Sequence, residues 1–192
     1  MTSFEKAISK IDEYNAQDPH KEVWSGISYP KEVLYAERMT QKLSEFNPNA
    51  SEALRLAARA QHIGRWEIPR EEYPDNRSGY LRWREALKKF HANTTEAILQ
   101  SAGYEPDFIA RVTTLIRKKG LKNDPGVQTL EDVICLVFLE FYFEDFAGKH
   151  PEDKIVDIIQ KTWNKMSEDG RNAALSLPLS ESSLHLIQKA IG

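Results

Sequence analysis

Helical periodicity is the feature that most constrains how this chain can fold. Apolar residues recur three or four positions apart in one segment after another, beginning with Phe4, Ile8 and Ile11. This spacing puts an apolar stripe on one side of a helix, which must then be buried against other helices. We find no convincing strand alternation with turn residues and no internal repeat in the sequence. The pattern predicts an all-α fold, a compact single-domain helical bundle over residues 1–192.

Proline and glycine divide this pattern into separate helices. Pro30, Gly64, Gly103 and the turn from Gly120 to Pro125 fall between apolar stripes, and both residue types mark helix boundaries. Ser51 suits a helix start. Residues 18–30 are expected to be a loop, and 65–78 a long loop of the kind that often carries function. The expected helices cover about 2–16, 31–46, 51–63, 79–101, 106–119, 126–147, 153–165 and 184–191.

Charge and cysteine content narrow the function classes. The 192 residues carry a formal net charge of -3, which argues against a general nucleic-acid binder, although a local basic patch is still compatible with it. The single Cys135 lies in an apolar run and predicts a buried thiol in a reducing compartment. No apolar stretch approaches the roughly 20 residues of a membrane span, and the acidic N-terminal segment is unlike a signal peptide. We expect a cytoplasmic protein that does not contact membranes.

The segment from Ala57 to His91 has an unusual composition. Trp and Tyr alternate with Arg there, between His62 and His91. A guanidinium group suits phosphate or carboxylate oxygens, and tryptophan rings stack on bases or on arginine. The cluster predicts a site for a small anionic or phosphorylated ligand, with nucleic acid as a less favoured partner. For any single residue, the alternative is a solvated helix face or an aromatic ring packed beneath a loop.

Lysines add candidate point charges for a phosphate. Lys161 and Lys165 lie four positions apart, on one face of a helix that Gly170 is expected to stop. One interpretation is a helix C-terminus that favours cations. The other is a turn that covers the ligand cleft and adds positive charge. The same point-charge role is open to Lys118, Lys119 and Lys122.

Histidine and carboxylate residues on separate predicted helices suggest a metal site. The candidates are Glu37, His62, His91, Glu131 and Asp132. Helical proteins build divalent-metal sites from such groups, because hydrogen bonds to the scaffold fix each ligand. Zn, Fe, Mn or Ni would suit this mixture. The alternative interpretation is packed or capping histidines, with the two acids stabilising a helix N-terminus.

The segments AARAQHIGR and HANTTEAILQSAGYEPDFIARVTTLIRKK resemble the HD superfamily of metal-dependent phosphohydrolases. The match places Gln61 and His62 at the His-Asp doublet and His91 at a family histidine, with Asp132 as the terminal aspartate. Glu37 lies about where the first histidine belongs. Lys118 or Lys119 replaces a later histidine. The resemblance implies an HD-domain-like bundle with His62, His91, Asp132 and Glu37 as metal ligands. With the doublet altered, it implies a single metal or an inactive site in place of the usual dinuclear centre.

A closer resemblance covers nearly the whole chain. AARAQHIGRW, GYLRWR, LEDVICLVFLE and KTW-KMS resemble the domain-of-unknown-function 4202 family. This resemblance implies no established activity. Within its motifs we expect the rim of the ligand site to be Arg65, Trp66, Arg70, Tyr73, Arg77, Tyr80, Trp83 and Arg84.

Together these features predict a metal-dependent hydrolase of a small phosphorylated compound, such as a nucleotide. A divalent metal would lower the pKa of a bound water, and Arg and Lys side chains, Lys118 among them, would neutralise charge on the phosphoryl oxygens. Glu131 is the candidate general base. Two alternatives are a non-catalytic nucleotide- or RNA-binding module that uses the Arg/Trp/Tyr cluster and an iron-dependent HD-type oxygenase.

Overall fold

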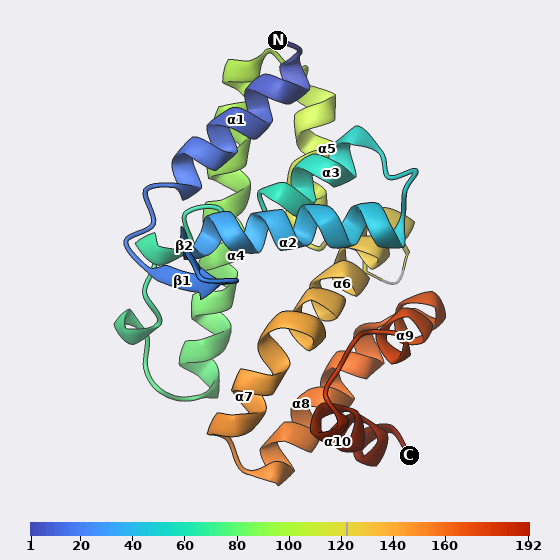
Figure 1. The fold of residues 1–192 in the computed structure, drawn as a ribbon. Helices are drawn as coiled ribbons and strands as arrows, with labels where there is room; N and C mark the ends of the chain where they lie inside the picture. The colour runs from blue at the N-terminus through green and yellow to red at the C-terminus, as the bar shows by residue number, and fades with distance from the viewer. Residues whose placement is uncertain (122) are drawn as a thin grey trace. The chain divides into compact units, whose positions relative to one another are not determined.

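The computed structural model describes residues 1–121 and 123–192, and most of these residues are helical, as predicted. Backbone contacts divide the chain into two compact units (Figure 1). The first unit comprises Met1–Ser44 and Pro48–Lys119, and the second comprises Glu45–Asn47 and Gly120–Gly192. That residues 1–192 form one domain stays a prediction. Lys122, one of the lysines considered above, lies outside the described residues.

The first unit is a helical assembly with a small hairpin. Its elements are α1 (Ser3–Asn15), β1 (Lys21–Trp24), β2 (Ile27–Pro30), α2 (Lys31–Phe46, whose last turn is assigned to the second unit), α3 (Glu52–Arg59), the 3₁₀ turns η1 (Arg65–Glu67) and η2 (Arg70–Glu72), α4 (Arg77–Ala102) and α5 (Pro106–Ile116). Side chains cap α1, α3 and α4 at their N-termini, and the Ser51 hydroxyl accepts the Leu54 N–H of α3 as its position suggested. Helix α4 ends at Gly103, which has φ 87°.

The apolar stripes of these helices meet in the interior of the first unit. Helix α4 packs against α1 and α5, and α3 packs against α1 and α5. Ile11, Met39, Leu56, Leu99 and Leu115 are fully buried there. The periodicity that predicted the helices therefore also identifies the side that each one buries.

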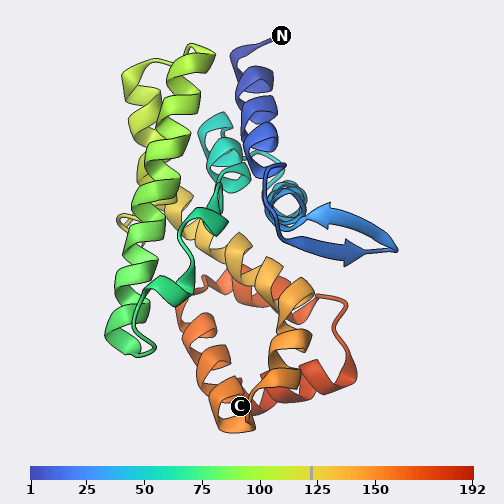
Figure 2. The ribbon, with the colours of Figure 1, turned by 90° about the vertical axis from the view of Figure 1, so that its left-hand side faces the viewer.

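A two-stranded antiparallel hairpin corrects the expectation of a loop over residues 18–30. Strands β1 and β2 pair with Trp24 opposite Ile27, and the hairpin extends away from the helices in Figure 2. Ser25 and Gly26 both have positive φ, 50° and 79°, as a tight two-residue hairpin turn requires. Arg38 of α2 holds the hairpin through an ion pair with Glu22 (2.6 Å) and a guanidinium 4.7 Å from the Trp24 ring. The strands are four residues long, too short for alternation to show in the sequence.

The second unit is entirely helical in its described residues. It contains α6 (Pro125–Val137), η3 (Phe138–Tyr142), α7 (Phe143–Lys149), α8 (Glu152–Lys165), α9 (Glu168–Leu175) and α10 (Glu181–Ile191). Helix α10 packs on α7 and α8, and α6 packs on α8 and α9. Leu136, Leu139, Phe143 and Ile159 lie at the centre of its core. The buried Cys135 belongs to this core, as predicted.

Two features of the second unit differ from the predicted helices. The segment expected to be one helix over residues 126–147 is interrupted by the π-helical turn η3. Helix α9 was not predicted, because Gly170 was expected to end the preceding helix. Gly170 instead lies inside α9, where its N–H donates to the Ser167 hydroxyl at 3.0 Å. Ser167 is the N-cap, so the 161–171 segment contains a helix start as well as a helix end.

None of the helices over the described residues is long and apolar enough to cross a membrane.

Candidate functional site

A glycine turn after α3 positions His62. Helix α3 ends at Arg59, five residues before the predicted boundary, and the chain turns through Gly64 with φ 64°. A Cβ on Gly64 would lie 2.7 Å from the Phe90 ring and 2.8 Å from the Tyr14 ring. The N–H of Gly64 donates to Asn15 Oδ1 at 3.2 Å. The turn is thus fixed by close packing, and His62 is held with it.

His62 lies between an acid, an arginine and an aromatic ring. Its imidazole stacks on the Tyr35 ring, with centroids 3.8 Å apart and planes 9° apart. Its Nε2 accepts a hydrogen bond from Arg65 Nη1 at 3.3 Å, because a guanidinium can only donate. The ring proton is then on Nδ1, which lies 3.5 Å from Glu32 Oε2 without forming a hydrogen bond to it. The His62 side chain is 24% exposed, so the cluster is open to solvent at this residue.

His91 occupies the adjoining position on α4. It is 3% exposed, and its ring centroid is 6.0 Å from that of His62. Its Nδ1 donates to the backbone carbonyl of Ile63 at 2.7 Å. Its Nε2 therefore carries a lone pair, and this buried nitrogen has no hydrogen-bond partner within the described residues. The structure thus brings His62 and His91 together, and their predicted role as metal ligands stays a prediction.

Both imidazoles are held neutral. Desolvation lowers the pKa of His62 well below its ordinary value, with further lowering by Arg65 and His91. Desolvation likewise lowers the pKa of His91 to about 3, against a smaller raising effect of its bond to Ile63. Arg84 and Lys118 lower the pKa of both rings. Three cationic side chains therefore act on one pair of uncharged imidazoles.

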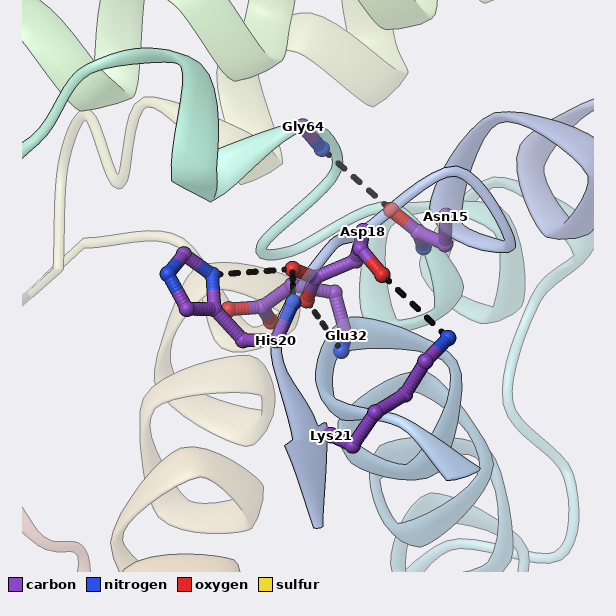
Figure 3. Close-up of polar contacts among 6 residues, drawn as sticks. All are labelled: Asn15, Asp18, His20, Lys21, Glu32 and Gly64. Carbon is purple, nitrogen blue, oxygen red and sulfur yellow. Dashed lines mark hydrogen bonds and ion pairs between the residues drawn. The ribbon is translucent and has the colours of Figure 1, made fainter. Parts of the chain in front are cut away.

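The carboxylate at His62 belongs to Glu32, and buried Asp18 positions it (Figure 3). Asp18 Oδ2 accepts the backbone N–H of Glu32 at 3.0 Å, and Oδ1 accepts that of His20 at 2.9 Å. Asp18 thus satisfies an N–H in the first turn of α2. Glu32 is 5% exposed, and desolvation raises its pKa to about 7, with a small contribution from Asp18 and an opposing one from Arg65.

Glu32 replaces Glu37 as the carboxylate of this site. Glu37 is exposed on α2, whereas Glu32 is within ion-pair distance of His62. The sequence contained a usable signal, because Glu32 precedes Tyr35 by three positions and so lies on the same helix face. Alignment with the superfamily pattern pointed instead to the acid at the expected histidine position.

Trp83 and Arg70 build the loop over residues 65–78. The Trp83 indole N–H donates to the carbonyl of Ile68 at 2.9 Å, and Arg65 lies 4.8 Å above its ring. Arg70 donates to the carbonyls of Tyr73 (2.9 Å) and Pro74 (3.0 Å). The buried Trp83 and the Arg70 guanidinium thus hold the backbone of the loop in place through its carbonyl groups. Whether either residue also contacts a ligand stays a prediction.

The other predicted rim residues have different surroundings. Arg84 Nη1 donates to the Tyr80 hydroxyl at 3.1 Å, and Tyr80 is exposed. Trp66 packs against Tyr14 with ring centroids 6.0 Å apart. Arg77 is exposed at the start of α4, and Tyr73 is half-buried. Of the predicted rim, only Arg65 and Arg84 are guanidinium groups that act on both histidines.

Asp132 belongs to the second unit, where it has a structural function. Its Oδ1 accepts from the N–H of Ser167 at 2.8 Å and from Gln128 at 3.2 Å, and its Oδ2 accepts from the Ser167 hydroxyl at 2.6 Å. A Cβ on Gly170 would lie 2.5 Å from Oδ1. Asp132 thus joins α6 to the start of α9. Its carboxylate oxygens are engaged by these hydrogen bonds, and its predicted role as a metal ligand stays a prediction.

The remaining predicted residues also lie in the second unit and make local ion pairs. Glu131 is buried, with Oε1 3.9 Å from Lys165 Nζ. Lys161 pairs with Asp157 one turn earlier at 2.6 Å. Their predicted catalytic and ligand-binding functions stay predictions.

The donor set does not fit a three-ligand metal site. Among the residues that the structure describes, no three His, Cys, Asp or Glu side chains are arranged to hold a metal ion. In the first unit, His62 Nε2 accepts a hydrogen bond from Arg65, and its Nδ1 points toward Glu32. Of the ring nitrogens of His62 and His91, His91 Nε2 is therefore the one whose lone pair has no hydrogen-bond donor.

Comparison with known proteins identifies a family and no activity. No curated protein matches the chain, and no solved structure matches it. The likeness to HD-type phosphohydrolases therefore stays a prediction. Residues 5–187 match the family described as "Domain of unknown function (DUF4202)". The match spans nearly all of the sequence, and the chain belongs to this family.

Proposed function

We propose that this chain binds a small phosphorylated ligand at the cluster of Arg65, Arg84 and Lys118 around His62 and His91. The observation that carries the proposal is the positive charge of Arg65 and Arg84 at a partly desolvated site. Desolvation lowers the pKa of the Arg65 guanidinium, and Arg84 lowers it further. Within the described residues, neither of these two guanidinium groups has a carboxylate within ion-pair distance.

The nearest acid, Glu32, offsets this charge only in part, although it raises the pKa of Arg65. Glu32 has a pKa of about 7, so at neutral pH its carboxyl is ionised only about half of the time. Both imidazoles are uncharged and add no negative charge. A phosphate dianion would supply the negative charge that balances Arg65 and Arg84, and it would accept hydrogen bonds from both guanidinium groups. Access is provided at His62, which is partly exposed.

The test is a titration with inorganic phosphate and adenosine 5′-monophosphate, followed by calorimetry at low salt. Arg84→Ala should weaken binding about 10- to 100-fold, the effect of losing a charge-assisted hydrogen bond. Arg82→Ala is the matched control, because Arg82 is exposed on the same helix. Failure of both compounds to bind the wild type, or an equal effect of the two variants, would refute the proposal. Binding of RNA without binding of either compound would favour the nucleic-acid alternative.

Metal-dependent phosphoester hydrolysis is the second candidate function, favoured by the geometry of His91. Donation from Nδ1 to a backbone carbonyl, with Nε2 carrying a lone pair, is also how metal-binding histidines are oriented. The donor set falls short of three ligands, so we derive no catalytic step through a metal. Metal analysis of the purified protein, with and without His91→Ala, tests this candidate. Stoichiometric metal that is lost in the variant would support it, and metal content unaffected by the variant would refute it.

A further inference from the structure

His91 presents a hydrogen-bond acceptor that a bare phosphate group does not satisfy. Its Nε2 is buried and has no partner within the described residues, because the only ring proton is used at Ile63. A buried acceptor without a donor costs free energy, and buried polar atoms are therefore normally hydrogen-bonded. At neutral pH a phosphomonoester dianion has oxygens that accept and no proton to donate. The phosphate itself cannot be the partner of Nε2.

The cations near His91 do not donate to Nε2 in the structure, because this nitrogen has no hydrogen-bond partner within the described residues. Arg65 uses Nη1 for His62, and Arg84 uses Nη1 for Tyr80. The other N–H groups of the two guanidiniums are available to the phosphate. A donor on the ligand, beside its phosphate, satisfies Nε2 without competing for these groups.

We propose that the ligand is a phosphomonoester of a hydroxyl-bearing compound, a sugar or polyol phosphate, whose hydroxyl donates to His91 Nε2 while its phosphate contacts Arg65 and Arg84. This inference rests on the proposed phosphate site and adds the chemistry of the attached group. His91 becomes a specificity-determining residue: it distinguishes esters by their hydroxyl groups. The 6.0 Å between the two imidazole centroids places this acceptor beside the residue through which the site opens to solvent.

The test compares two esters of similar size, glycerol 3-phosphate with two hydroxyl groups and propyl phosphate with none. By calorimetry at pH 7.5, the wild type should bind glycerol 3-phosphate roughly tenfold more tightly, the effect of one satisfied hydrogen bond. His91→Asn can still donate to the Ile63 carbonyl but lacks an atom at Nε2, so it should bind both esters about equally. His91→Gln, which places an amide oxygen near Nε2, is the matched control and should keep most of the preference.

A measurement on the wild-type protein alone tests the same inference even if the His91 variants do not fold. In ¹⁵N spectra of the imidazoles, glycerol 3-phosphate should shift His91 Nε2 toward the hydrogen-bonded value, and propyl phosphate should not. If both esters bind equally tightly and leave Nε2 unchanged, the phosphate site holds and the hydroxyl inference is overturned. If neither ester binds, the proposed function itself has failed. A preference that persists in His91→Asn would also overturn the inference.

Discussion

Replacing Glu32 with glutamine tests the electrostatics of the site most directly. Glu32 is 5% exposed, and its pKa is raised from 4.5 to about 7, chiefly by desolvation. The folded state therefore holds a proton on this carboxyl more tightly than the unfolded chain does. The favourable contribution is complete below about pH 4.5 and is lost as the pH rises through 7. Glutamine has no proton to lose, so Glu32→Gln removes this loss of stability at high pH.

The size of the effect follows from the shift in pKa. At about 1.4 kcal/mol per unit, a change from 4.5 to about 7 corresponds to roughly 3 kcal/mol. The variant should gain about that much stability over the wild type between pH 4.5 and 8, with most of the gain between pH 5 and 7. The unfolded histidines titrate alike in both proteins, and their contribution cancels in the difference. Glu32 alone then accounts for the pH dependence of the difference.

The assay is urea unfolding at a series of pH values, with the two free energies of unfolding subtracted at each. Glu37→Gln is the control, because Glu37 is exposed on the same helix and its variant should show no comparable trend. A difference for Glu32→Gln that stays flat from pH 4.5 to 8 would mean that the carboxyl is solvated. The account of the site as desolvated and cationic would then be wrong.

Three further predictions concern backbone packing and acid stability. Gly64→Ala should destabilise the chain by about 1–3 kcal/mol in urea unfolding, because Gly64 has a positive φ and an added Cβ would meet the Phe90 and Tyr14 rings. The control is Gly148→Ala, whose Cβ would meet nothing within 4 Å. An equal loss of stability in the two variants would contradict the prediction. Gly170→Ala should lower the thermal midpoint, because its Cβ would displace the Asp132 carboxylate; an unchanged midpoint would show that this contact is dispensable. The His91 contribution to wild-type stability should be lost as the pH falls from 6.5 toward 3, because His91 takes up a proton in the unfolded chain before the folded one. The Glu32 contribution has the opposite sign and is common to the wild type and the His91 variant. His91→Asn should lose less over the same range, and identical acid profiles would show that His91 is not buried as a neutral ring.

The parts of the fold set by local spacing were predictable from the sequence. The long apolar stripes of α1, α2 and α4 have one side to bury, and their caps are sequence signals. The hairpin was missed because its strands are short, and α9 was missed because Gly170 looks like a stop signal. In α9 the absence of a side chain instead allows close approach to Asp132.

The site was predictable in its location and less so in its members. The two histidines flank a loop, and residue type and the family resemblance assigned them to one candidate site. Spacing does not determine which arginine faces the ligand and which donates to the loop carbonyls, because that depends on side-chain direction in an irregular segment. Arg70 and Arg65 lie five residues apart, yet one holds the loop together and the other donates to His62. Glu32 was missed because its partner is distant in sequence.

The π-helical turn η3 sets the rotation of everything that follows it in the second unit. A π turn accommodates one extra residue in a helix, and each α-helical residue turns the chain by about 100°. Deleting one residue from Phe138–Tyr142 would restore a regular helix and rotate α7 by about that angle. Phe143, now fully buried, would then point away from Leu136 and Ile159. The extra residue in η3 thus corrects the rotation of the chain, so that α6 before the turn and α7 after it both direct apolar residues into the same core.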